Sequence, residues 1–259
     1  MNIIKQYWLN ILLAFLSVAV VYFASFAKLD SEANARIDSS FKQALGVFAT
    51  AKALNAVISL AQGTQLGVGL TISIGEVLDP INDLVERFSW IMLASLTSLG
   101  IQKILMSVVV YGGFEVLLIF SLVVSNLLLY YKSKKYQSSK YIFFKFTILL
   151  VFLRFSIPFM ALCNEFVYVN FVKQEYSIEQ SQQVLVSAKD KISKLDHKEA
   201  SYFSKDYYKN KFLEFQDVAS SAADKIVDLI IVFVFQTMLF PILFLWFLYR
   251  IFIFSLRPL

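Results

Sequence analysis

The chain contains very few of the residues that build reactive or metal-binding sites. Its 259 residues include one cysteine, Cys163, and one histidine, His197. A single cysteine excludes a disulfide within the chain, and the two residues together are too few for a zinc site of cysteine and histidine ligands. Cys163 ends an apolar run and His197 lies in a later polar segment, so no local pattern pairs them as nucleophile and base. We expect Cys163 to behave as a small buried hydrophobe.

Signature motifs of catalysis are also missing. The sequence has no HExxH, GxSxG or Walker loop and no paired carboxylates in an apolar context. Asp79, Asp83 and Glu86 share one face of a predicted helix, but acids near a helix start commonly complement the helix dipole. We therefore expect neither an enzyme nor a bound metal or cofactor.

Charged residues are also scarce in this chain. Only 17% of the residues are charged, 58% are hydrophobic, and the mean hydropathy is +0.64. An average soluble domain has about a quarter of its residues charged. The chain is therefore predicted to be an integral membrane protein whose main surroundings are the lipid bilayer.

Four apolar stretches reach the length of about 20 residues that a helix needs to cross a bilayer. The charges between them are separated by sign. The segments on one side hold eight basic residues and no acidic one, whereas all nineteen Asp and Glu lie in residues 30–115 and 165–228. By the positive-inside rule both termini are cytoplasmic. We expect a cell membrane, specifically a bacterial inner membrane, and the net charge of +5 reports orientation rather than nucleic acid binding.

The predicted fold is an all-α integral membrane protein with four transmembrane helices that continue into two long external antiparallel helical hairpins. A short β segment, residues 65–75, forms the tip of the first hairpin. The expected order is a cytoplasmic start and first transmembrane helix (1–27), first hairpin (28–113), second transmembrane helix (114–131), basic cytoplasmic loop (132–140), third transmembrane helix (141–162), second hairpin (163–225), fourth transmembrane helix (226–249) and cytoplasmic tail (250–259).

Two alternatives stay open. Lys5 followed by an apolar run, with Ser25 and Ala27 at small-residue positions, is compatible with a cleaved signal peptide; the run of about 21 residues exceeds the usual 7 to 15, which favours an uncleaved anchor.

Residues 44–62 and 88–111 could add two membrane crossings and bring the number of spans to six. Their polar residues disfavour this, namely Lys52, Asn55, Gln102 and Lys103.

The outgoing helix of the first hairpin shows apolar residues at alternating spacings of four and three, which is typical of a coiled coil. No Pro or Gly separates it from the first span, so one continuous helix is expected as far as Gln62, before Gly63. Asp79 and Pro80 predict the start of the returning helix as N-cap and first position, and Gly112–Gly113 predicts a kink. The seam consists of Ile37, Phe41, Ala44, Phe48, Ala51, Asn55 and Ile58.

Between these helices the period changes to two, which predicts a strand that pairs with a partner. Its apolar face comprises Leu66, Val68, Leu70, Ile72 and Ile74, and the alternative is an irregular Gly-rich loop. The second hairpin repeats the helical plan, with its tip within Asp196–Asp206. Its seams are Ile178, Leu185, Ala188, Ile192 and Leu195 on the outgoing helix, and Tyr208, Phe212, Phe215, Ala219, Ala222 and Ile226 on the returning one.

Arg154 is the most notable polar residue within a predicted span. A charge there is costly and often functional, and we expect a charge network with Glu115 and Asp228 at the outer ends of neighbouring spans. A structural ion pair or a snorkelling arginine is the other interpretation. Asn126 and Gln236 are further polar residues that could lie along a pathway.

These features predict a nonenzymatic membrane protein whose external hairpins mediate self-assembly or bind a partner, either further copies of the chain or another envelope protein. The apolar excess of residues 88–111 motivates this, because large exposed apolar patches mark interaction surfaces. The alternative is an oligomeric channel or transport component with Arg154 near the pathway.

Overall fold

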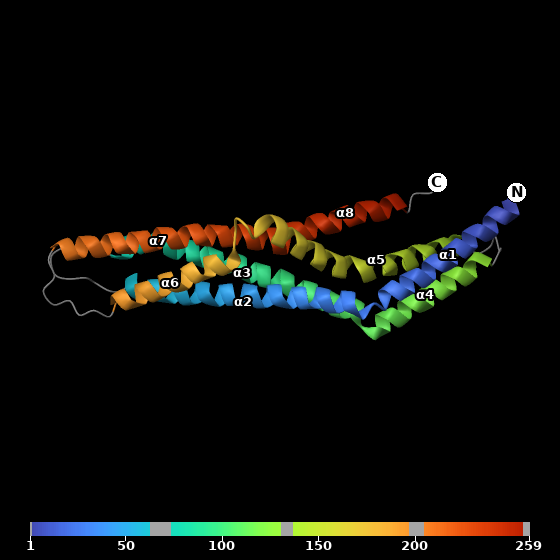
Figure 1. Cartoon of the computed structure of the whole chain (residues 1–259), viewed down its shortest axis with the longest axis horizontal. Coiled ribbons are helices and arrows are strands. Elements are labelled where there is room, and N and C mark those ends of the chain that lie inside the picture. The colour runs from blue at the N-terminus through green and yellow to red at the C-terminus, as the bar shows by residue number, and fades with distance from the viewer. Residues whose placement is uncertain (1, 63–73, 131–136, 197–204, 256–259) are drawn as a thin grey trace. The chain divides into compact units, whose positions relative to one another are not determined.

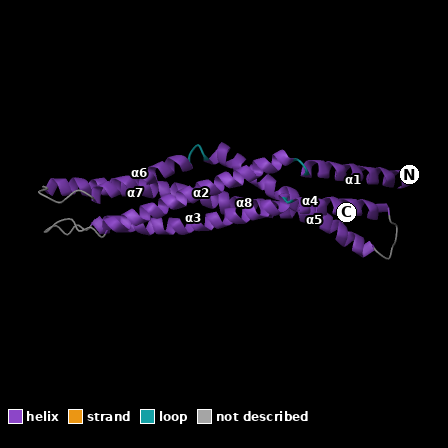
Figure 2. Ribbon diagram, turned by 90° about the horizontal axis from the view of Figure 1, so that it is seen from below, coloured by secondary structure: helices purple, strands orange, loops and turns teal. Residues whose placement is uncertain are grey.

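The computed structural model describes residues 2–62, 74–130, 137–196 and 205–255. Helix accounts for 96% of these residues, and no strand occurs among them (Figure 2). The all-helical fold class is therefore confirmed for the described part of the chain.

The helices follow one another with short connections (Figure 1). The first four are α1 (Asn2–Ala24), α2 (Ala27–Gln62), α3 (Ile74–Val110) and α4 (Gly112–Tyr130). They are followed by α5 (Gln137–Val167), the π-helical turn η2 (Tyr168–Val172), α6 (Ile178–Asp196), α7 (Lys205–Val234), the π-helical turn η3 (Phe235–Leu239) and α8 (Phe240–Ser255).

The chain divides into two compact units. Unit 1 comprises residues 1–38, 100–165 and 241–259, and unit 2 comprises residues 39–99 and 166–240. Unit 1 therefore holds α1, α4, α8 and most of α5. Unit 2 holds α6, α7 and the longer parts of α2 and α3.

Four helical stretches are long and apolar enough to cross a membrane, as the predicted number requires. Two of them, Lys140–Val172 and Phe212–Arg250, contain the predicted third and fourth spans. The other two, Ala27–Gln62 and Leu78–Val110, belong to the hairpin that we expected outside the membrane. The predicted first and second spans correspond to shorter apolar helices, Ile11–Ala24 and Gly112–Leu128. Length and composition thus support a multi-pass membrane protein with more apolar helix than four spans need.

Three helix boundaries differ from the sequence prediction or refine it. α1 and α2 are separate helices with a break at Ser25–Phe26, whereas a continuous helix was expected; α2 is described as far as Gln62, and the predicted helix end at Gly63 lies outside the described residues. α3 begins at Ile74 rather than at Asp79, so Pro80 lies inside the helix. Gln62 Nε2 donates to Asp79 Oδ1 at 2.8 Å, and this contact between helices occupies the carboxylate that was expected to cap α3.

The bend between α3 and α4 lies at Tyr111, immediately before the two glycines that predicted it. Tyr111 keeps its N–H bonded to the Ser107 carbonyl at 3.1 Å, and its own carbonyl accepts from Phe114 N at 2.8 Å. A side chain at Gly113 would place its Cβ 2.5 Å from Tyr111 Cε1, so the aromatic ring lies closely over this glycine. The bend is therefore built from a hydrogen-bonded tyrosine and the glycine beneath it.

The core of unit 2 confirms half of the α2 seam and corrects the other half. Ala44, Ala51 and Ile58 are fully buried, but they alternate with Val47 and Leu54. Phe48 and Asn55, which were predicted in those places, are only partly buried. One cluster joins residues of α2, α3, α6 and α7. In these two places the buried residue comes one position earlier than predicted, which turns it by about 100° around the helix.

The second hairpin buries most of the residues that its spacing predicted. Ile178, Leu185, Ala188 and Ile192 of α6 and Phe215, Ala219, Ala222 and Ile226 of α7 are all buried. Phe212 is only partly buried, and the side chains of Leu195 and Tyr208 lie outside the described part. α6 and α7 lie side by side and run in opposite directions (Figures 1 and 2). α6 ends at Asp196 and α7 begins at Lys205, so the connection falls in the predicted tip.

The corrected seam can be tested by comparing two adjacent residues of α2. Leu54→Ala should lower the free energy of unfolding by about 2–5 kcal/mol, because it leaves a cavity in the core. Asn55→Ala should change it by less than about 1 kcal/mol, since the buried Asn55 Oδ1 has no hydrogen-bond partner among the described residues. Thermal unfolding in detergent, followed by circular dichroism, measures both. A larger loss of unfolding free energy for Asn55→Ala than for Leu54→Ala would support the seam predicted from the sequence, with Asn55 in the core.

Candidate functional site

The most buried charge in unit 1 belongs to an ion pair between α5 and α2. Arg154 is 3% exposed and Asp30 is 9% exposed. Arg154 Nη1 donates to Asp30 Oδ1 at 2.8 Å, and Nη2 donates to Asp30 Oδ2 at 2.5 Å. The planar guanidinium thus engages both carboxylate oxygens, which is the strongest geometry available to such a pair.

The same guanidinium also satisfies a helix end. Arg154 Nη2 donates to the carbonyl of Ala24, the last residue of α1. Carbonyls at the end of a helix lack intrahelical donors, and leaving one unpaired away from water is costly. Asp30 lies in the first turn of α2, where a negative charge is favourable. Arg154 therefore stabilises both helix ends at the α1–α2 break.

The partner that the structure gives Arg154 was not among those predicted. Glu115 accepts a hydrogen bond from Ser25 Oγ, and Asp228 pairs with Lys225 of its own helix at 2.8 Å. The sequence prediction treated α1 and α2 as one helix and did not consider Asp30 at the start of α2. Glu115 nevertheless lies near Arg154 and Asp30, since all three residues line a pocket of about 540 Å³ together with Ser25.

A second polar layer joins α1, α4 and α5 within unit 1. Asn126 Nδ2 donates to Ser17 Oγ at 2.9 Å and also to the Leu122 carbonyl. Thr147 Oγ1 shares hydrogen bonds with Ser121 Oγ at 2.6 Å and with Ser125 Oγ at 2.8 Å. Polar contacts of this kind hold helices together in membranes. Asn126 is thus part of helix packing.

The two polar layers are in register. Ser17 precedes Ala24 by seven residues on α1, and Thr147 precedes Arg154 by seven residues on α5. Both intervals correspond to about 10 Å of helix. Ala24, Leu118, Leu122 and Leu150 form one buried apolar cluster of unit 1. Polar and apolar contacts therefore both hold these helices together.

Gln236, the other predicted pathway residue, belongs to unit 2. It lies in η3 and is 8% exposed, next to Thr237, which is 2% exposed. Ser98 Oγ of α3 donates to the Thr237 carbonyl at 2.5 Å. The π-helical turn therefore presents a carbonyl group to a neighbouring helix, and Gln236 is buried beside this contact.

Four residues of the predicted interaction strand, Leu66, Val68, Leu70 and Ile72, lie outside the described residues, as does His197. Ile74 was predicted to end that strand, but it is the first residue of α3. The helix starts before its proline, so Ile74 takes part in a helical backbone rather than a strand.

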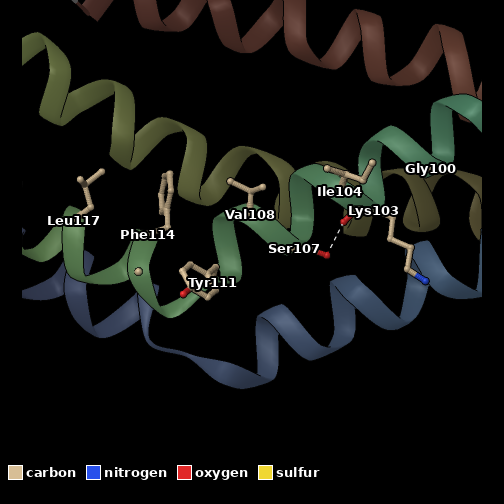
Figure 3. A pocket seen from close by; sticks show the side chains of 9 residues that line it. Gly100, Lys103, Ile104, Ser107, Val108, Tyr111, Phe114 and Leu117 are labelled. Carbon is tan, nitrogen blue, oxygen red and sulfur yellow. Dashed lines mark hydrogen bonds between the residues drawn. The ribbon is translucent and has the colours of Figure 1, made fainter.

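The bend between α3 and α4 holds a larger apolar pocket that the sequence prediction missed. Its volume is about 690 Å³. Side chains of Ile104, Val108, Phe114 and Leu117 point to one side of the ribbon, whereas Lys103 points toward α2 (Figure 3). Lys103 Nζ lies 2.6 Å from Asp38 Oδ1. The lining is completed by Gly100, Ser107, Tyr111 and Gly113.

No family model, curated protein or solved structure matches this chain. Within the described ranges, no group of three or more His, Cys, Asp or Glu residues is arranged to hold a metal ion. Cys163 is a free thiol of intermediate exposure.

The contribution of the buried Arg154–Asp30 pair to the free energy of unfolding can be measured by replacing Arg154. Arg154→Ala leaves the Asp30 carboxylate buried without its partner, which should cost about 3–5 kcal/mol of unfolding free energy. Arg36→Ala is the matched control, because Arg36 pairs with Glu165 at 3.1 Å while its side chain is 53% exposed. An exposed pair contributes about 0–1 kcal/mol. Equal losses for both variants, measured by thermal unfolding in detergent, would refute the special role of Arg154.

Proposed function

We propose that the protein is a nonenzymatic, multi-pass protein of a bacterial inner membrane whose external helical part mediates self-assembly or binds another envelope protein. The membrane-spanning helices are α1, α4, residues 141–162 of α5, and the end of α7 with α8. The two hairpins, α2–α3 and α6–α7, lie outside.

The side chains that unit 1 exposes support this topology. α1, α4 and α8 all expose large apolar side chains, as expected for a surface in contact with lipid. Exposed fractions on α1 reach 70% for Trp8, 75% for Phe15 and 68% for Tyr22. The corresponding residues are Val116, Phe120, Val123 and Leu127 on α4, and Ile242, Leu243, Trp246 and Phe247 on α8.

α2 has the opposite surface, although its length and composition would allow it to span. Its buried residues are mostly apolar, and five charged side chains lie among its exposed residues, together with the apolar Leu45 and Leu60. A bilayer core would not solvate these charges, so the first part of α2 fits an aqueous position. Within residues 44–62, which six spans would place in the membrane, Lys52 is the exposed charge that favours four spans. The exposed charged residues are Lys28, Glu32, Arg36, Lys42 and Lys52.

The arrangement of helix ends supports cytoplasmic termini. The start of α1, the end of α4 and the start of α5 lie toward one end of unit 1 (Figure 1). Lys145 Nζ lies 4.3 Å from the centre of the Tyr141 ring near the start of α5. A lysine beside an exposed tyrosine is typical of a membrane interface. The basic residues of this end assign it to the cytoplasm.

Apolar exposure within unit 2 carries the functional proposal. Leu60, Trp90 and Leu93 are 66%, 65% and 45% exposed. Outside a bilayer such side chains are uncovered, and exposed apolar patches mark surfaces that bind protein. The assembly function therefore rests on exposed apolar side chains of α2 and α3, above all Trp90.

The alternative was an oligomeric channel with Arg154 near its pathway. Arg154 is neutralised by Asp30 and buried, and Asn126 is hydrogen-bonded to Ser17. These contacts favour a structural role for both residues. We therefore prefer the assembly function.

The proposed four-span topology predicts which introduced cysteines react with a reagent that cannot cross the membrane. In a Cys163→Ser background, Glu32→Cys and Lys52→Cys should react with a membrane-impermeant maleimide added to the outside of spheroplasts. Phe15→Cys and Phe120→Cys, which replace lipid-facing residues, should stay unlabelled until the membrane is dissolved. Protection of both α2 positions would place that helix in the bilayer and contradict the four-span topology.

The assembly function predicts that a charge in the exposed apolar patch weakens association. Trp90→Glu should shift the protein toward the monomer, because the substituted side chain resists burial against a partner. Lys52→Glu, on the exposed polar face of α2, is the control and should leave association unchanged. Native mass spectrometry from membrane nanodiscs reads both. A wild-type protein that is monomeric and free of partners in native membranes would refute the proposal.

A further inference from the structure

Two cavities of unit 1 follow one another along the contact between α1 and α4. A polar pocket of about 540 Å³ lies at the α1–α2 break, and an apolar groove of about 570 Å³ lies between α1 and α4 themselves. All the residues that line them belong to unit 1. The lining of the apolar groove includes Val18, Tyr22, Ile119, Val123 and Leu127.

The two cavities occupy the same helix faces. On α4, Glu115 lines the polar pocket, and Ile119 and Leu122 line the apolar groove at intervals of four and three residues. On α1, Val21 lines the groove and Ala24 lines the polar pocket, three residues later. Residues at these intervals lie on one face of a helix. The apolar groove therefore meets the polar pocket within about one helical turn.

The polar pocket has two groups whose electrostatic partners are missing. Its lining holds two carboxylates, Asp30 and Glu115, but one cation, Arg154, which pairs with Asp30. Glu115 accepts a hydrogen bond from Ser25 and has no cationic partner among the described residues. Arg154 Nε is buried, and no acceptor for it occurs within the described part of the chain. The pocket thus combines a carboxylate that lacks a cation with an N–H group that lacks an oxygen.

The surroundings of the polar pocket indicate the source of a ligand. Tyr22 and Phe23 are exposed near the end of α1, and Lys28 is exposed at the start of α2. Aromatic and basic residues of this kind mark the headgroup level of a bilayer. Under the proposed topology, the polar pocket lies at the level of the outer headgroups and the apolar groove lies in the hydrocarbon.

We propose that the apolar groove and the polar pocket together bind one phospholipid whose headgroup carries an ammonium group, as in phosphatidylethanolamine. An acyl chain covers the apolar side chains of the groove. The ammonium group pairs with Glu115, and the phosphate supplies the oxygen that Arg154 Nε lacks. Tyr111, which also lines the pocket, adds a ring that attracts an ammonium group. This inference rests on the proposed topology and does not depend on the assembly surface of unit 2.

Titration of the full chain with lipid in detergent, followed by native mass spectrometry, tests the headgroup contact. Glu115→Gln should weaken the binding of phosphatidylethanolamine about tenfold, because the contact with the ammonium group loses its charge. The glutamine carbonyl can still accept the bond from Ser25, so the unfolding temperature without added lipid should stay unchanged. Glu32→Gln is the control, since Glu32 is exposed on α2 and does not line the pocket. Phosphatidylglycerol has no ammonium group, so Glu115→Gln should not weaken its binding.

A second pair of variants tests the acyl-chain contact by the same measurement. Val123→Trp fills the apolar groove and should weaken the binding of phosphatidylethanolamine about tenfold, which is the effect of uncovering roughly two methylene groups. Phe120→Trp is the matched control, because Phe120 is an exposed residue of α4 that does not line the groove. It should leave lipid binding unchanged.

Each opposite outcome overturns a stated part of the inference. Unchanged binding of phosphatidylethanolamine by Glu115→Gln would refute the headgroup contact, and equal binding by Val123→Trp and the wild type would refute the groove. Glycerophosphoethanolamine, which has the headgroup without acyl chains, should not displace the lipid at equal concentration; displacement would identify a free amine as the ligand. The Trp90→Glu variant reads the assembly function separately. Thiol labelling that places α2 in the bilayer would refute the topology and this inference together.

Discussion

The buried Arg154–Asp30 pair is the interaction on which the arrangement of unit 1 depends. A helix that breaks within an apolar environment exposes polar backbone groups that water cannot reach. Here the guanidinium of a third helix binds the carbonyl of Ala24 and the carboxylate of Asp30. The chain can therefore stop α1, change direction and begin α2 without an unpaired charge. Neither a shorter cation nor a neutral side chain would make all of these contacts.

Under the proposed topology, the contrast between α1 and α2 means that mean hydropathy alone does not identify a membrane-spanning helix. α2 is long and apolar enough to span, but many of its apolar residues are buried in the core of unit 2 and its exposed side chains include five charged ones. α1 buries little, and its exposed face is apolar. The distinction lies in which residues face outward, and this depends on the neighbours that each helix has.

Sequence patterns predicted the features that depend on local periodicity. Most seam positions of α6 and α7 follow from spacing. Features that depend on three-dimensional neighbours were not predictable from one sequence. No proline or glycine signals the break at Ser25–Phe26, so the sequence did not indicate that Asp30 pairs with Arg154. α3 includes residues before Pro80 although the proline favoured a later start, and Leu54 is buried in place of Asn55 within a core to which four helices contribute.

The matched spacing of the two polar layers has a mechanical consequence. If α5 slid by one helical turn along α1 and α4, the Thr147 hydroxyl contacts with α4 and the Arg154 contact with α1 would be lost in the same step. Such a displacement has no intermediate in which one layer holds while the other re-forms, so axial sliding is opposed. Hinging at the α1–α2 break would strain the same guanidinium, because Arg154 binds the last residue of α1 and the first turn of α2. One side chain therefore resists both movements.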